Sequence, residues 1–351
     1  MKKLLSNVWF SMFSIVLLTV LGLIFALYDS YKTVWTTISH LDPVRLVLII
    51  ILGVFTYLGW GAILTIFGRT IDPKYTFKNG VINAYVGGFM SGITPSSTGG
   101  QFAQIYAYRK AGLKSSQGAG LISMDFFLYQ ISYVILAIVL YVVYLSTYTG
   151  FAISVIFAIS LFLNSFVVIV MWIMVQFPKL YHRLSYWAII LLHKAKFVKN
   201  KEKILETWNG TLTHFSESIE AISQNKKVFW VALSLNILRF LAYFSTPFFI
   251  AVLLDIPVTA DQFLPILSLA GFVSIANTFV PLPGASGATE SLFVLVMATI
   301  VGKGAAASIM ILWRFTNFYV PVIFGGWLFI RLRNLKITNK FSTADLLGED
   351  K

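Results

Sequence analysis

Four ionisable residues, Asp125, Arg239, Glu290 and Arg314, lie inside otherwise apolar segments of the sequence. A charge at the centre of a membrane span costs roughly 2.5–3.5 kcal/mol on insertion scales, so such residues face a protein interior, a wet cavity or each other. Arginine binds phosphate through charge-assisted hydrogen bonds, and a carboxylate within the membrane is a typical proton site. We therefore expect Arg239 and Arg314 to neutralise a phosphate, with Glu290 or Asp125 available for proton coupling.

A purely structural role competes with this chemistry. Arg239 and Arg314 both lie near the middle of long apolar stretches, and Glu290 follows a Pro-Gly turn. We predict that Glu290 pairs with one arginine, that the other stays free for a ligand, and that the three form one functional cluster. The alternative is a buried ion pair that only fixes helix packing. For Asp125, one to two turns into its stretch, packing near the membrane interface is the stronger interpretation.

Two stretches, at residues 92–101 and 279–290, interrupt apolar segments with Pro, Gly and small hydroxyl residues. Helix-breaking backbone at membrane depth is tolerated only where protein buries it or where it lines a cavity. Paired interruptions in corresponding positions of two halves indicate a transporter's substrate site. We therefore add these candidate site residues to the four charges: Pro95, Gly99, Gly100, Gln101, Gln104, Pro281, Pro283, Gly284 and Gly287.

The chemistry expected of the two interruptions is anion binding. Gly99 and Gly287 fall where the second half of each broken helix begins, and a helix N-terminus offers free N–H groups and a positive dipole end. Plain turn-making is the competing interpretation. The amides Gln101, Gln104, Asn277 and Asn317 would be costly toward lipid, so we expect them to point inward.

The composition indicates an integral membrane protein. Hydrophobic residues make up 58% of the 351 residues and charged residues only 12%, against about 25% charged in soluble domains. The net charge of +13 does not indicate nucleic acid, because the basic residues cluster at the ends of apolar stretches. The absence of cysteine excludes disulfides and thiolate catalysis. We find no metal-ligand spacing, catalytic constellation or cofactor fingerprint, and expect no cofactor.

Six uninterrupted apolar stretches exceed the roughly 20 residues that a membrane span requires. They cover residues 8–28, 44–67, 119–144, 151–176, 228–253 and 305–330. The predicted fold is an all-α integral membrane protein with about six full spans and two broken re-entrant helical hairpins. Residues 1–337 form one polytopic domain and 338–351 a polar tail. Residues 177–227 are predicted to be an amphipathic connector on the cytoplasmic face.

The distribution of Lys and Arg gives the orientation. Basic residues flank the first broken segment on both sides, so we expect it to enter and leave from the cytoplasm. The second broken segment, which follows acidic residues, should enter from outside. The units 44–145 and 228–330 then form an inverted repeat, with both termini inside a bacterial plasma membrane. Two short full crossings per broken segment would carry the same flanking charges and stay an alternative.

At the two broken segments the sequence resembles the transmembrane, flippase-like domain of the lysylphosphatidylglycerol synthetase family. The matching residues are Thr94-Pro95 followed by Gly99-Gly100, with Arg109 to Gly112 beyond, and Pro281-x-Pro283-Gly284-x-x-Gly287-x-x-Glu290. The resemblance covers nearly the whole chain and implies movement of a phospholipid or aminoacylated phospholipid between leaflets, with a link to antibiotic resistance. Many relatives have Glu and Arg at the positions of Gln101 and Gln104, so the exact substrate does not carry over.

Full-length members of that family attach lysine to phosphatidylglycerol with a separate soluble domain. Only about twenty residues follow the last predicted span here, so we expect no lysyltransferase activity. The leading hypothesis is a lipid flippase whose partner is an anionic or aminoacylated phospholipid headgroup. A secondary transporter of a soluble solute and a membrane partner of a separate lipid-modifying enzyme are the alternatives. A homo-oligomer is left open.

Overall fold

The computed structural model describes residues 31–94, 97–145, 151–177, 224–278, 280 and 282–334, with a few positions between 183 and 222. The first predicted span, most of the connector and the polar tail lie outside these residues. All regular elements of the described part are helical, which confirms the all-α prediction. The α-helices are α2 (Tyr31–Ser39), α3 (Pro43–Ile71), α4 (Phe77–Ile93), α5 (Gly99–Lys110), α6 (Ser115–Leu140), α8 (Phe151–Gln176), α11 (Lys226–Leu253), α12 (Phe263–Asn277), α13 (Ala288–Val301), α14 (Lys303–Arg314) and α15 (Val320–Asn334).

The five predicted spans that fall in the described part are confirmed as helices long and apolar enough to cross a membrane. The last of them runs through α14, a π-helical turn at Phe315–Tyr319 and α15. The start of α3 is set locally, because the Asp42 side chain accepts a hydrogen bond from Val44 N at 3.1 Å and Pro43 occupies the first turn. A sixth apolar stretch of sufficient length, Pro283–Val301, includes the second interruption.

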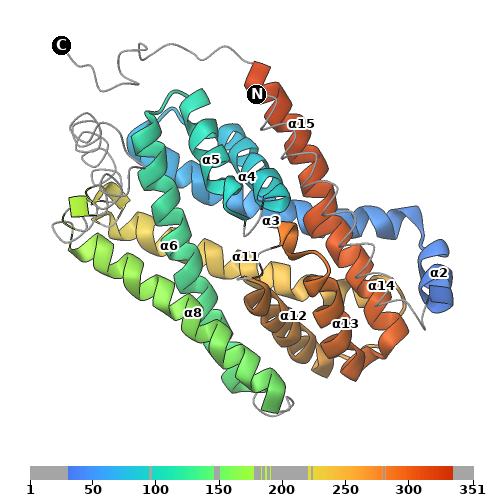
Figure 1. The fold of residues 1–351 in the computed structure, drawn as a ribbon. Helices are drawn as coiled ribbons and strands as arrows, with labels where there is room; N and C mark the ends of the chain where they lie inside the picture. Colours follow the sequence, from blue (N-terminus) through green and yellow to red (C-terminus); the bar gives the residue numbers. More distant parts are fainter. Residues whose placement is uncertain are drawn as a thin grey trace, which may run out of the picture.

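Each broken segment forms two short helices that pack against each other, α4 with α5 and α12 with α13 (Figure 1). α5 has 12 residues and α13 has 14, which correspond to about 18 and 21 Å, whereas the hydrocarbon core is about 30 Å thick. In both units a long helix is followed by such a pair and then by another long helix. The re-entrant and inverted arrangement that this order suggests stays a prediction.

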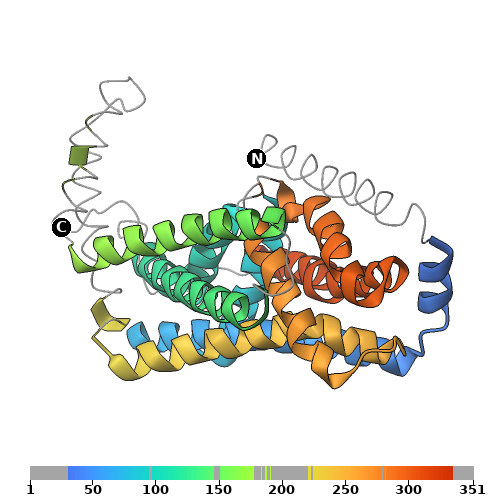
Figure 2. The ribbon, with the colours of Figure 1, turned by 90° about the horizontal axis from the view of Figure 1, so that it is seen from below.

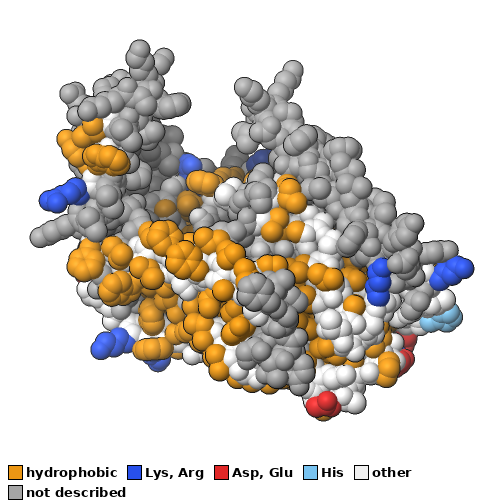
Figure 3. Space-filling model, turned by 60° about the horizontal axis from the view of Figure 1, so that its bottom comes forward, with side chains coloured by type: hydrophobic (Ala, Val, Ile, Leu, Met, Phe, Trp, Pro, Cys, Tyr) orange, Lys and Arg blue, Asp and Glu red, His pale blue; other side chains and the backbone are white. Residues whose placement is uncertain are grey.

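The two units meet along several contacts. α3 and α11 lie side by side, as Figure 2 shows, and α15 packs on α4. The turn Pro283–Ala285 at the second interruption contacts α4, so the two broken segments converge. The outer face of the molecule carries many exposed apolar side chains, with the visible charges toward its edges (Figure 3). An apolar outer face is what contact with lipid requires.

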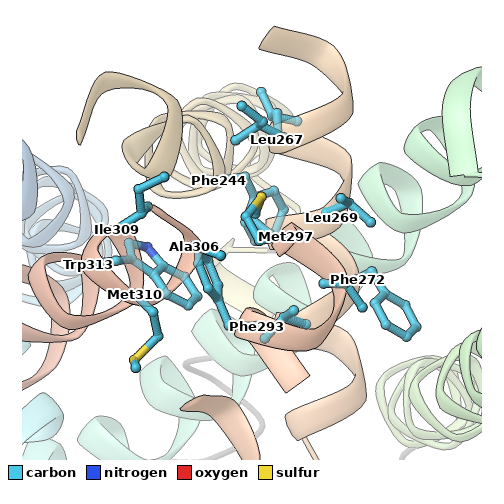
Figure 4. Close-up of a cluster of buried hydrophobic side chains, with 14 of the residues drawn as sticks. Phe244, Leu267, Leu269, Phe272, Phe293, Met297, Ala306, Ile309, Met310 and Trp313 are labelled. Carbon is cyan, nitrogen blue, oxygen red and sulfur yellow. The ribbon is translucent and has the colours of Figure 1, made fainter. Parts of the chain in front are cut away.

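The second unit is held by a dense apolar cluster. Phe244 of α11, Phe293 and Met297 of α13 and Trp313 of α14 lie together in it (Figure 4). The Phe293 and Trp313 rings stack with centroids 4.9 Å apart. This packing fixes α13 and α14 against each other and thereby sets the positions of Glu290 and Arg314, which these helices carry.

Close approach of α15 to α4 depends on Gly325. A Cβ atom added there would lie 2.2 Å from the backbone oxygen of Tyr85, which cannot move without moving α4. We expect Gly325→Ala to lower stability by about 1–3 kcal/mol, as overpacking does. Thermal melts of the purified protein in detergent test this. Gly59→Ala is the control, because its added Cβ would meet only side-chain atoms at 3.7 Å or more; equal melting temperatures for both variants would contradict the prediction.

Candidate functional site

A cavity of about 600 Å³ lies where the two units converge. Its walls come from α3, α4, α5, α6, α8, α11, α12, α13 and α14, together with the two interruptions and the π-helical turn after α14. Six of the predicted site residues line it: Gln101, Gln104, Asp125, Arg239, Gly284 and Arg314. The amides Asn277 and Asn317 line it as well, so all four amides expected to point inward do so.

Glu290 and Arg314 form a buried ion pair beside this cavity. The Arg314 Nε donates to Glu290 Oε1 at 2.8 Å, and the side chains are 9% and 1% exposed. The second guanidinium edge donates to the Gly284 carbonyl at 3.1 Å and to Ser286 Oγ at 3.3 Å. The ring of Phe318 lies 4.1 Å from the Arg314 Cζ. Arg314 is thus the arginine that Glu290 neutralises.

The second interruption is a turn whose backbone groups form hydrogen bonds within the protein. Its backbone takes positive φ angles at Gly284 (59°) and Gly287 (84°), which glycine adopts without strain. The Gly287 N–H donates to Glu290 Oε2 at 2.6 Å, so the carboxylate caps the start of α13 as well as pairing with Arg314. The Gly287 N–H, which the sequence predicted as a donor to a bound anion, thus donates to the Glu290 carboxylate. Pro283 is buried in the turn, and Pro281 lies outside the described residues.

The first interruption is also closed by its own contacts. Gly99 N donates to Thr94 Oγ1 at 2.9 Å. Gly100 packs against α4, where a Cβ would lie 1.9 Å from Ser91 Oγ. These two glycines therefore bring α5 onto α4 and do not line the cavity. Gln101 and Gln104, in the first two turns of α5, lie at the cavity wall. Pro95 lies outside the described residues.

Arg239 stands apart from the Glu290–Arg314 pair. Its Nη2 donates to Asn236 Oδ1 at 3.0 Å, and no carboxylate oxygen of the described residues lies within 4 Å of its guanidinium. Its Cζ is instead 5.3 Å from the ring centroid of Trp60, 5.6 Å from that of Tyr129 and 5.0 Å from that of Phe240. Cation–π contacts of this kind stabilise a guanidinium without neutralising its charge.

Asp125 is linked to Arg239 through Trp60. The indole Nε1 of Trp60 donates to Asp125 Oδ2 at 3.0 Å, and the same ring lies beside the guanidinium. Asp125 is only 5% exposed. It is the tenth residue after Ser115, where α6 begins. The structure thus shows a buried carboxylate at the cavity wall, and the position of Asp125 near the membrane interface stays a prediction. The cavity therefore has two charged subsites, Arg239 near Asp125 and Arg314 paired with Glu290, and joint action of the three predicted charges stays a prediction.

The cavity has an unusual share of unsatisfied polar groups. Seven lining side chains have a buried nitrogen or oxygen atom without a hydrogen-bond partner: Gln104, Asp125, Gln130, Arg239, Asn277, Trp313 and Asn317. Buried polar atoms in native proteins are nearly always paired with protein, water or a ligand. The donors Arg239 Nε and Trp313 Nε1 suit an anion, whereas Asp125 Oδ1 suits a hydroxyl or ammonium group. Water molecules, or a polar ligand that carries both kinds of group, would satisfy this set.

The aromatic wall was missed by the sequence analysis. Tyr57 and Trp60 on α3, Tyr129 and Tyr133 on α6 and Tyr243 on α11 line the cavity. Their spacing of three or four residues on each of two helices is a usable signal, because a tyrosine hydroxyl in mid-span is costly toward lipid.

The family follows from comparison with known sequences. The sequence profile described as the lysylphosphatidylglycerol synthase TM region matches residues 11–325. The chain belongs to this family. A UPF0104 membrane protein of Archaeoglobus fulgidus is 24% identical over 318 residues, which cover 89% of this chain and 93% of that protein. A UPF0104 membrane protein of Pyrococcus horikoshii is 23% identical over 307 residues, covering 84% and 89%. The chain is therefore a multi-pass membrane protein of this family, similar along most of its length to proteins named only as membrane proteins.

Proposed function

We propose that this chain binds a phospholipid headgroup in the central cavity and moves that lipid between the leaflets of the membrane. The observation that carries the proposal is Arg239, a guanidinium without a carboxylate partner among the described residues that lines a cavity rich in unsatisfied polar atoms. A lipid phosphate provides the missing counter-charge through charge-assisted hydrogen bonds. Family membership supports a membrane role, and the cavity chemistry supports the headgroup.

The two subsites have different tasks in this proposal. The Glu290–Arg314 pair holds the turn between α12 and α13 in shape, since it also contacts Gly284, Ser286 and Gly287. Arg239 meets the phosphate, and Asp125 meets a hydroxyl or ammonium group of the same headgroup. The charge distribution of the sequence supports cytoplasmic termini in a plasma membrane. Coupling to a proton at Asp125 or Glu290 stays a prediction.

Reconstitution into liposomes tests the proposal. A phosphatidylglycerol with a fluorescent tail is placed in both leaflets, and its bleaching by a membrane-impermeant reductant reports movement between them. We expect rapid protein-dependent bleaching beyond half of the signal. The Asn277→Phe variant should reduce the rate by about tenfold or more, because a phenyl ring fills part of the cavity that the headgroup occupies.

The matched control is Leu295→Phe, which adds a ring on the 66% exposed outer side of α13. It should melt and transport as the unmodified protein does. Absence of protein-dependent movement for phosphatidylglycerol, phosphatidylethanolamine and an aminoacylated phospholipid alike would contradict the proposal. Uptake of a water-soluble anion that Asn277→Phe abolishes would instead assign the cavity to a soluble solute.

A further inference from the structure

A side groove of about 270 Å³ adjoins the central cavity. Its lining is apolar except for Gln101 and Ser123, and the remaining residues come from α6 and α8: Phe126, Phe166, Val167, Val170 and Met171. Three residues, Gln101, Phe126 and Val167, line both the groove and the central cavity. The two spaces are therefore neighbours along one wall, with Gln101 of α5 where they meet.

The groove leads to the lipid-facing side of the molecule. Phe166 and Val170 are 56% and 38% exposed, and they belong to the apolar outer face of α8. Along this route the lining changes from the unsatisfied polar atoms of the central cavity to side chains that favour hydrocarbon. A molecule that fills both spaces has a polar end and an apolar end.

α8 forms the outer side of this route. It packs mainly against α6 and α12, at the edge of the bundle (Figure 1). The hydrogen bond that joins it to α6 runs from Gln130 Nε2 to Asn164 Oδ1, at 3.3 Å. Asn164 and Ser160 are buried, whereas most of the described large apolar side chains of α8 face outward. The helix is thus fixed on its α6 side and open on its α5 side, where the groove lies.

We propose that the groove between α5, α6 and α8 holds the acyl chains of the phospholipid whose headgroup lies at Arg239, so that α8 forms one side of a lateral entrance. This inference rests on the proposed function. It names the apolar part of the ligand and the route by which it reaches the cavity from the bilayer. A headgroup in the cavity with its tails still in hydrocarbon avoids the cost of moving acyl chains through a polar interior.

The absence of cysteine allows a direct test. A bimane fluorophore is attached to Phe166→Cys in the groove, or to Phe162→Cys, a 69% exposed control position on α8 outside the groove lining. Liposomes contain phosphatidylglycerol with a nitroxide on one acyl chain, at increasing mole fraction. We expect saturable quenching at position 166 at about tenfold lower mole fraction than at 162. Quenching at position 162 should increase linearly with the mole fraction of the nitroxide lipid.

The outcomes separate this inference from the proposed function. Equal, non-saturating quenching at both positions overturns the groove, even when lipid movement is measured in liposomes. Saturable quenching at 166 that Arg239→Gln leaves unchanged supports the groove and contradicts the headgroup site. Saturable quenching that Arg239→Gln shifts about tenfold supports both. Val170→Cys repeats the measurement at a second groove position and replaces Phe166→Cys if that variant does not fold.

Discussion

The Glu290→Gln variant is expected to lose about 3–5 kcal/mol of stability, the usual cost of removing one partner from a buried ion pair. Glu290 Oε1 accepts from Arg314 and Oε2 accepts from the Gly287 N–H. A glutamine side chain has one carbonyl oxygen, so its amide N–H₂ would face a donor in either orientation. The buried Arg314 charge would also lose its counter-charge.

A double-mutant cycle isolates the pair. Glu290→Gln combined with Arg314→Gln should cost clearly less than the sum of the two single variants, because neither charge is then left alone. Melting temperatures in detergent are the measurement. The half-exposed ion pair of Arg45 and Asp255 is the matched control, and Asp255→Asn should cost only about 0–1 kcal/mol. Additive effects at Glu290 and Arg314 would mean that the pair does not act as a unit.

The Arg239→Gln variant is expected to retain its fold and lose its transport. Arg239 has no carboxylate oxygen within 4 Å among the described residues, so its removal breaks no direct ion pair. A hydrogen bond to a charged group contributes about 1.5–3 kcal/mol, so lipid movement should fall by roughly 10- to 100-fold. The melting temperature should fall less than in Glu290→Gln, since the structural cost is the bond to Asn236 and the cation–π contacts with the surrounding rings.

The control for Arg239 is Arg331→Gln. Arg331 also lies over an aromatic ring, with its Cζ 4.0 Å from the Trp327 centroid, but it is exposed and outside the cavity. It should transport at the unmodified rate. Unchanged transport in Arg239→Gln, measured with the fluorescent-lipid assay, would contradict the phosphate role. A comparable loss of lipid movement in Arg331→Gln would show that transport depends on positive charge in general and not on the position of Arg239.

The long helices and the two interruptions could be predicted from the sequence because lipid imposes simple requirements on length and polarity. The same reasoning predicted that amides and charges point inward, and the described ones do. It could not decide which arginine pairs with Glu290, because that depends on how far each helix is rotated about its axis. A π-helical turn directly follows Arg314 and changes the direction of the side chains after it, and no motif in the sequence marks this turn.

The glycines of the two interruptions show a second limit of prediction from the sequence. Gly99, Gly100 and Gly287 were predicted as ligand-binding backbone, yet their contacts with Thr94, Ser91 and Glu290 lie within the protein. A glycine that admits a ligand and one that admits a neighbouring helix have the same sequence signature. The aromatic wall could not be predicted for a related reason. α3 is apolar on all sides, so its sequence pattern does not reveal which side faces the cavity.

The contacts of Arg314 have a mechanical consequence. Through Glu290, Gly284 and Ser286 this side chain joins the turn after α12, the start of α13 and the end of α14. The stacked Phe293 and Trp313 rings join the same helices a turn away. We therefore expect these parts to move together, because displacing the turn alone would break a buried ion pair. We therefore expect any motion that opens the cavity to involve the walls away from this turn, among them α8 at the edge of the bundle.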